Sequence, residues 1–160
     1  MTGESRPRVL VADDDQSIRQ LLCTIVRREH VECDAVGDGD EAIAKLRQHD
    51  YAVILLDLMM PRGNGFDVIE YLKANPKPIK PVVLVITAYA DQKFKEVDPA
   101  IVAGVLRKPF EVAELGNLVR LCAAGFQQEI SQKLSGSRDR AIRDFAQYHS
   151  TDSGKGESSN

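Results

Sequence analysis

Short apolar runs alternate with longer segments of helical periodicity along most of the chain. Five runs have the length and composition of β-strands: Val9–Ala12, Val31–Val36, Val53–Leu56, Val82–Ile86 and a short Val105–Arg107. The third and fourth runs are continuously apolar, which is typical of central parallel strands that are covered on both faces. Strands that alternate with helices indicate βα units around a parallel sheet, so the pattern predicts an α/β fold.

Helical periodicity predicts four helices between and after these strands: Gln16–Arg28, Asp40–Gln48, Phe66–Ala74 and Val112–Leu134. In the first helix, the apolar residues that recur at helical spacing are Ile18, Leu21, Leu22 and Ile25. They predict one apolar stripe along that helix. A further helix between Asp91 and Ala103 is expected to be short or broken, because Pro99 cannot donate a backbone hydrogen bond inside it.

The composition adds a size and a charge to this picture. The chain has 160 residues, of which 43% are hydrophobic and 28% charged, and this is ordinary for one globular domain. Its 21 basic and 24 acidic residues give a net charge of −3, so we expect no direct binding to nucleic acid and none to an anionic membrane.

Cysteine usage and the N-terminal residues bear on the compartment. Cys23, Cys33 and Cys122 are far apart in the sequence and form no CxxC pair, so we expect neither a disulfide nor a zinc site, only three small apolar side chains. The first residues, MTGESRPR, contain no apolar signal core, and no run approaches the roughly 18 apolar residues of a membrane span. We therefore expect a cytoplasmic protein.

The chain is expected to divide into three parts. Residues 1–7 form a flexible N-terminus, residues 8–134 one domain with an extended last helix, and residues 135–160 a polar tail that is partly helical or disordered.

Chemically active side chains collect where the predicted strands end. Acidic residues follow the first and third strands, and a hydroxyl and an ammonium end the fourth and fifth: Asp13, Asp14, Asp15, Asp57, Thr87 and Lys108. Singly, each has an ordinary structural explanation, for example Asp15 as the N-cap of the first helix. Jointly they converge on the carboxyl edge of a parallel sheet, where ligands of open α/β folds bind.

At these residues the chain resembles the receiver domain of two-component response regulators. The matching segments, in the family's order, are VLVADDDQSIRQLL, DGDEAI, ILLDLMMPRGNGFDVI, VLVITAYAD and LRKPF, which together cover roughly residues 8 to 122. The resemblance implies a doubly wound, five-stranded parallel sheet of the flavodoxin-like or CheY-like type, with strand order 2-1-3-4-5.

By position, Asp57 resembles the aspartate that accepts a phosphoryl group. Asp13 and Asp14 look like the acidic pair that holds Mg²⁺ together with Asp57, and the backbone carbonyl of Met59 resembles a further ligand. Three carboxylates close together repel one another, and Mg²⁺ suits such a set of oxygen ligands.

Thr87 and Lys108 resemble the two residues that contact the phosphoryl group, and the Lys108–Pro109 bond is similar to one that the family usually holds cis. Gly63 and Gly65 are expected to serve as turn residues in the loop after Asp57.

The resemblance also implies a function and partners. A histidine kinase or a histidine phosphotransfer protein would supply the phosphoryl group, and the phosphorylated chain would signal through contacts with a downstream protein, with room for a homodimer linked to phosphorylation. The chain would then be no enzyme beyond catalysing its own phosphorylation and dephosphorylation.

Two alternatives stay open. Val105 stands where most receivers carry an aromatic residue that turns inward on activation, which leaves room for a pseudo-receiver that signals without phosphate. A phosphohydrolase of the haloacid-dehalogenase type would use Asp13 as nucleophile and Asp15 as general acid. The second alternative leaves Asp57 idle, and no acidic pair follows Lys108.

Overall fold

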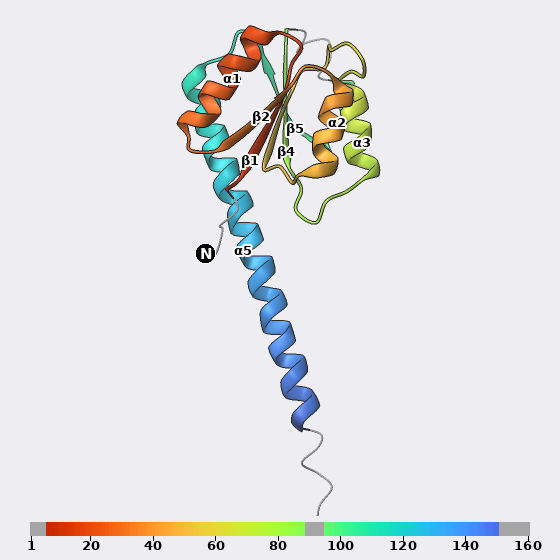
Figure 1. Cartoon of the computed structure of the whole chain (residues 1–160), viewed down its shortest axis with the longest axis vertical. Coiled ribbons are helices and arrows are strands. Elements are labelled where there is room, and N and C mark those ends of the chain that lie inside the picture. The colour runs from red at the N-terminus through yellow and green to blue at the C-terminus, as the bar shows by residue number, and fades with distance from the viewer. Residues whose placement is uncertain (1–5, 89–94, 151–160) are drawn as a thin grey trace, which may run out of the picture. The chain divides into compact units, whose positions relative to one another are not determined.

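A five-stranded parallel sheet lies at the centre of this computed structural model, which describes residues 6–88 and 95–150 and, along the last helix, side chains up to Leu134. The strands are β1 (Arg8–Ala12), β2 (Glu32–Val36), β3 (Val53–Leu56), β4 (Val82–Thr87) and β5 (Val102–Arg107). They lie in the order β2-β1-β3-β4-β5, and every neighbouring pair is parallel (Figure 1). The predicted doubly wound α/β fold is confirmed.

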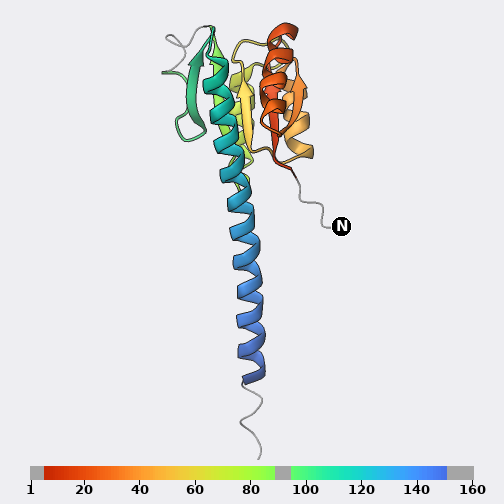
Figure 2. The ribbon, with the colours of Figure 1, turned by 90° about the vertical axis from the view of Figure 1, so that its left-hand side faces the viewer.

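Helices cover both faces of the sheet. They are α1 (Gln16–Arg28), α2 (Gly39–Gln48), α3 (Gly65–Ala74) and α5 (Val112–Ser150). In Figures 1 and 2, α1 and the beginning of α5 lie over one face, and α2 and α3 over the other. At Gly116 the two helices of the first face are close, since a Cβ there would lie 3.7 Å from the side chain of Ile25.

Alternate strand residues fill two apolar layers. Leu10 and Ala12 of β1 belong to a buried cluster with residues of α2 and α3, such as Leu46 and Val68. Because successive side chains of a strand point to opposite faces, the equally buried Val9 belongs to the layer beneath α1 and α5. The core thus fixes the strands tightly and leaves their carboxyl ends free to carry polar side chains.

The apolar stripe of α1 differs from the prediction. Leu21 is 40% exposed, and the buried residues of this helix are Leu22, Cys23, Ile25 and Val26. The three cysteines are free and buried or half-buried, as expected, but treating them as separate was wrong, because Cys23 and Cys33 are in contact.

The region between β4 and β5 contains no helix in residues 95–101, which form turns; the rest of the predicted helix, up to residue 94, lies outside the described residues. Pro99 lies in one of these turns.

Helix α5 continues past the predicted end at Leu134 to Ser150 and so includes Ile142 and Phe145. The chain falls into two compact units, Met1–Phe126 and Gln127–Asn160. The first contains the sheet, α1 to α3 and the beginning of α5, and the second continues α5.

In the part of the chain that the structure describes, no helix has the length and apolar character needed to cross a membrane.

Candidate functional site

The register of the sheet brings Asp13 and Asp57 together. Ala12 at the end of β1 is paired with Leu56 at the end of β3, so the next residue of each strand stands at the same edge. The backbone N–H of Asp57 donates to the carbonyl of Ala12 at 2.9 Å, and that of Asp13 donates to the carbonyl of Val36 at 3.2 Å. Asp13 is 1% exposed and Asp57 is 7% exposed. Two carboxylates are therefore buried beside each other.

Lys108 supplies the positive charge for this pair. Its backbone N–H donates to the carbonyl of Thr87 at 3.0 Å, which carries the chain past the end of β5 to the same edge. Its Nζ atom lies 2.7 Å from Oδ2 of Asp13 and 3.3 Å from Oδ2 of Asp57. One ammonium group thus bridges two buried carboxylates. The expected cis peptide bond between Lys108 and Pro109 is confirmed.

The loop after Asp57 is folded closely against it. The backbone N–H of Met59 donates to Oδ1 of Asp57 at 3.1 Å. The N–H of Gly65 donates to the carbonyl of Leu58 at 3.0 Å, and a Cβ on Gly65 would lie only 2.5 Å from the carbonyl oxygen of Asp57. Gly63 has a φ of +82°, in the left-handed region that favours glycine. Gly63 lies in the loop as predicted, but the prediction of Gly65 as a turn residue is wrong, because Gly65 is the first residue of α3, where it permits close backbone packing.

Burial and charge act differently on the pKa values of Asp57 and Lys108. Burial raises the pKa of Asp57 above its ordinary value, although the Met59 N–H and the Lys108 charge act in the opposite direction. For Lys108 the balance is different. Burial lowers its pKa, but the hydrogen bond to Asp13 and the negative charges of Asp57 and Asp13 outweigh that effect and raise it. The ammonium therefore stays charged at neutral pH.

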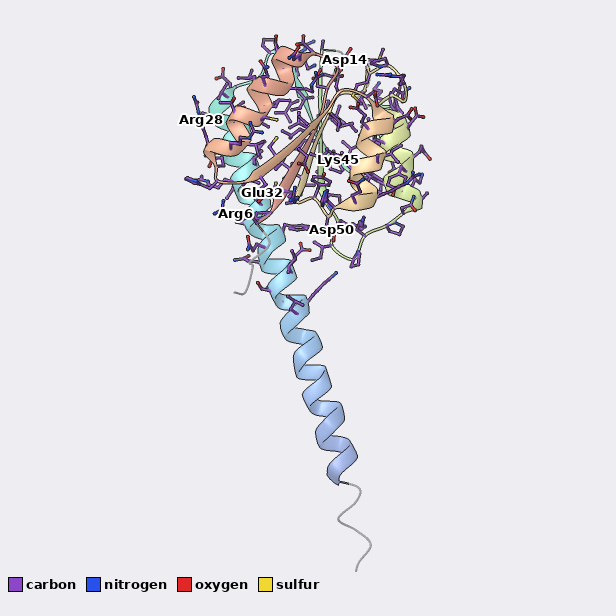
Figure 3. The ribbon with its side chains drawn as sticks, in the orientation of Figure 1. Arg6, Asp14, Arg28, Glu32, Lys45 and Asp50 are labelled. Atoms are coloured by element: carbon purple, nitrogen blue, oxygen red, sulfur yellow. The ribbon has the colours of Figure 1, made fainter. Side chains whose placement is uncertain are left out.

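Asp14 completes a group of oxygen ligands. Carboxylate oxygens of Asp13, Asp14 and Asp57 all lie within 4.8 Å of one another, and in the described ranges no other trio of histidine, cysteine or acidic side chains does so. Asp14 is exposed and stands at the end of the sheet where the strands finish (Figure 3). Clustered carboxylate oxygens, open to solvent on one side, suit a hard divalent cation such as Mg²⁺.

Thr87 and Val105 lie in the paired strands β4 and β5. Thr87 ends β4 opposite Arg107 and is fully buried. Val105 is half-buried and pairs with Val85.

Asp15 is the N-cap of α1. Its Oδ1 accepts hydrogen bonds from the backbone N–H groups of Ser17 at 2.8 Å and Ile18 at 3.2 Å. This capping role speaks against its use as the general acid of a phosphohydrolase.

Sequence reasoning missed Arg19. Its Nη1 donates to the backbone carbonyl of Asp13 at 2.8 Å and so ties α1 to the end of β1. The available signal was a cation placed about one turn after the N-cap Asp15, on the helix that follows the acidic residues.

The chain matches the response regulator receiver domain over residues 9–120. It is 34% identical over 133 residues to the DNA-binding response regulator MtrA of Mycolicibacterium smegmatis, an alignment that covers 81% of this chain and 56% of that protein. The transcriptional regulatory protein PdtaR of Mycobacterium tuberculosis is 32% identical over 123 residues, covering 76% of this chain and 58% of PdtaR. The chain thus spans about half the length of these curated relatives.

Solved structures agree with this match. The chemotaxis protein CheY4 of Vibrio cholerae superposes with a TM-score of 0.66 at 27% identity, covering 74% of this chain and 99% of CheY4. The response regulator TrrA of Thermotoga maritima, solved in complex with Mg²⁺ and BeF, superposes with a TM-score of 0.64 at 28% identity, covering 72% and 98%. The chain therefore belongs to the response regulator receiver family, the phospho-accepting signalling domains of two-component systems.

Proposed function

We propose that Asp57 is the residue that accepts the phosphoryl group, from a phosphohistidine of a histidine kinase or a histidine phosphotransfer protein. The observation that carries this assignment is the bridging position of Lys108, whose ammonium lies between the buried carboxylates of Asp13 and Asp57. Phosphoryl transfer needs mainly positioning and neutralisation of the charge on three phosphoryl oxygens. A fixed cation beside a buried carboxylate supplies both.

Asp57 is a better acceptor than Asp13. Both oxygens of Asp13 are engaged at short distances, Oδ2 by Lys108 at 2.7 Å and Oδ1 by the N–H of Asp15 at 3.0 Å. Both oxygens of Asp57 have partners at longer distances, Oδ1 the N–H of Met59 at 3.1 Å and Oδ2 Lys108 at 3.3 Å. Burial raises the pKa of Asp57, and a more basic carboxylate is a stronger nucleophile.

The donor set fits Mg²⁺. The carboxylates of Asp13, Asp14 and Asp57 would hold the ion, together with the backbone carbonyl of Met59. When bound, Mg²⁺ would supply positive charge that offsets the negative charge of the carboxylates and of the incoming phosphoryl group.

In the transfer itself, the bond between phosphorus and the donor imidazole nitrogen breaks and a bond between phosphorus and a carboxylate oxygen of Asp57 forms. The electron pair of the broken bond stays on the imidazole nitrogen, which takes up a proton from water, so that neutral imidazole leaves. Lys108 neutralises a phosphoryl oxygen, and the hydroxyl of Thr87, at the neighbouring strand end, donates to another. The product is an acyl phosphate, which stores the energy of the donor bond.

We also propose that the protein signals through a downstream protein and catalyses only its own phosphorylation and dephosphorylation. MtrA is described as DNA-binding, but this chain matches only part of its length. The net charge of −3 gives no support to direct nucleic-acid binding. A cytoplasmic location is proposed as well, since histidine kinases present their phosphohistidine there.

The test is incubation of the full chain with acetyl phosphate and Mg²⁺, followed by measurement of intact mass. The wild type should gain one labile phosphoryl group and Asp57→Asn none. Asp50→Asn is the matched control, because Asp50 is a surface carboxylate paired with Lys77 at 3.1 Å and stands at the opposite end of the sheet from Asp14 (Figure 3). Absence of a mass gain in the wild type would instead support a pseudo-receiver.

A further inference from the structure

Two thiols meet between α1 and β2. The Sγ atoms of Cys23 in α1 and Cys33 in β2 lie 2.8 Å apart, and both thiols are free. Cys23 is 5% exposed and Cys33 is half-buried. The phosphoryl-transfer chemistry described above uses neither residue.

The geometry favours a direct bond between the two sulfur atoms. A disulfide has a sulfur–sulfur distance of about 2.05 Å, so the separation of 2.8 Å exceeds it by less than about 1 Å. A metal site would need further ligands nearby. In the described part of the chain, no third histidine, cysteine or acidic group gathers around this thiol pair.

The two thiols are electrically unequal. The hydrogen bond from Cys33 lowers the pKa of Cys23 to about 7, burial and Asp34 oppose this, and the charges of Arg27 and Arg19 assist it. The same hydrogen bond and burial raise the pKa of Cys33. Cys23 is thus partly ionised at neutral pH and Cys33 donates the hydrogen bond to it, which is the division of roles found in reactive cysteine pairs.

A small oxidant can reach the pair from solvent. Cys33 lines an open surface pocket of about 400 Å³ together with residues that include Arg6 and Glu32. Because Sγ of Cys23 touches that of Cys33, it lies directly behind the pocket wall.

We propose that Cys23 and Cys33 are a modification site that a hydroperoxide oxidises to an intramolecular disulfide. The Cys23 thiolate attacks one peroxide oxygen, the O–O bond breaks, and Cys23 becomes a sulfenic acid while hydroxide leaves. The Cys33 sulfur then attacks that of Cys23, the S–O bond breaks, and the leaving hydroxide combines with the Cys33 proton to give water. The two sulfurs are oxidised, and the peroxide is reduced by two electrons.

This pair is separate from the phosphoryl-accepting edge. Cys33 is paired with Val9, near the start of β1, whereas Asp13 follows the end of that strand. Figure 3 shows Glu32 and Arg6, which line the same pocket as Cys33, at the opposite end of the sheet from Asp14. The disulfide would tie α1 to β2 without using a residue of the acidic group.

The test treats the reduced full chain with hydrogen peroxide and then alkylates the remaining thiols. The wild type should lose two hydrogens and keep one alkylatable thiol, Cys122. Trypsin should release the peptide 20–27 linked to the peptide 29–45. The matched control Cys122→Ser should form the same link, while Cys23→Ser and Cys33→Ser should not.

The rate provides a second measurement. Burial raises the pKa of Cys122, so its oxidation should be slower than that of the pair by on the order of tenfold. Retention of the alkylatable thiols of both Cys23 and Cys33 after Cys122 itself has been oxidised, or a link that involves Cys122, would overturn the proposal. So would conversion of Cys23 to sulfinic acid in the wild type without the linked peptides.

Discussion

Asp13 and Lys108 stand 95 positions apart in the sequence and meet at 2.7 Å between Oδ2 and Nζ. In the strand order β2-β1-β3-β4-β5, two strands lie between the strand that precedes Asp13 and the strand that precedes Lys108. Asp57 follows β3, one of those two strands, and so comes within 3.3 Å of the same Nζ atom. The contact exists only when the whole sheet is assembled, so the charge balance of the site is coupled to the fold.

Replacement of Lys108 should lower the stability of the fold, because Lys108 balances the charges of Asp13 and Asp57. Lys108→Met leaves two buried carboxylates without their cation, and we expect a loss of about 2 kcal/mol in the free energy of unfolding at neutral pH, below the usual figure for a broken buried pair because Lys108 is partly exposed. Urea denaturation measures this loss in the free energy of unfolding. The control Lys73→Met breaks the pair between the exposed Lys73 and Asp98 and should cost much less. Equal losses in the two variants would contradict the bridging role.

Asp57→Asn should have the opposite effect on stability. The folded state raises the pKa of Asp57 through burial, so it binds the proton more tightly than the unfolded chain does. Protonation of Asp57 therefore stabilises the folded state. This stabilisation is fully present below the ordinary pKa of 3.8 and is lost as the pH rises through the pKa that Asp57 has in the folded state. The metal-free variant should therefore be more stable than the wild type at neutral pH.

Urea midpoints at neutral pH and at about pH 3 measure this difference, which should shrink in acid. Asp50→Asn serves as the control and should change stability little at either pH, since its carboxylate is exposed. If the Asp57→Asn protein is less stable than the wild type at neutral pH, burial is not the main influence on the Asp57 carboxylate.

The close packing of Gly65 can be tested with a pair of alanine substitutions. Gly65→Ala places a Cβ 2.5 Å from the carbonyl oxygen of Asp57 and 2.7 Å from Cα of Leu58, so backbone must shift. We expect a loss of about 1–3 kcal/mol and weaker phosphorylation. Gly125→Ala meets no atom within 4 Å and should stabilise the helix by about 0.5–1 kcal/mol. Thermal unfolding and phosphorylation assays on both variants would separate the two effects, and an unaffected Gly65→Ala would refute the packing argument.

Magnesium binding should depend on Asp14. Asp14 is exposed, so Asp14→Asn should change the metal-free stability little, yet it should weaken Mg²⁺ binding by at least about tenfold because one carboxylate ligand is lost. The rise of the unfolding temperature with added Mg²⁺, reversed by EDTA, gives the affinity. Asp15→Asn removes a neighbouring charge but keeps a good N-cap, and it should bind Mg²⁺ as the wild type does. A tenfold loss in both variants would point to general charge rather than ligation.

Much of the fold could be predicted from the sequence, because helices cover both faces of the sheet and the central strands therefore appear as continuous apolar runs. Continuous apolar runs placed β3 with the observed bounds Val53–Leu56, and the helical pattern placed α1 at Gln16–Arg28. Prediction was less accurate where burial is partial. Leu21 satisfies the helical spacing but lies on the exposed side. β5 begins at Val102 rather than Val105 because its pairing with β4 already starts at Val102 and continues, past a register shift, through the half-buried Gly104.

The acidic residues and Lys108 were found because parallel strands end at one edge, which is a property of topology alone. The contacts that depend on side-chain direction could not be found in this way. Arg19 reaches a backbone carbonyl, a group that every residue carries, so its place one turn after Asp15 was the one signal for this contact. Cys23 meets Cys33 only because a helix packs on the neighbouring strand.

Locating the acyl phosphate chemically decides whether Asp57 is the acceptor. After incubation of the full chain with acetyl phosphate and Mg²⁺, reduction with sodium borohydride converts an aspartyl phosphate into homoserine, and fragment mass spectra identify its position. We expect homoserine at position 57 alone and none in the Asp57→Asn variant. Homoserine at Asp13 or Asp14 in the wild type, or a phosphorylated chain that yields no homoserine at position 57, would contradict it.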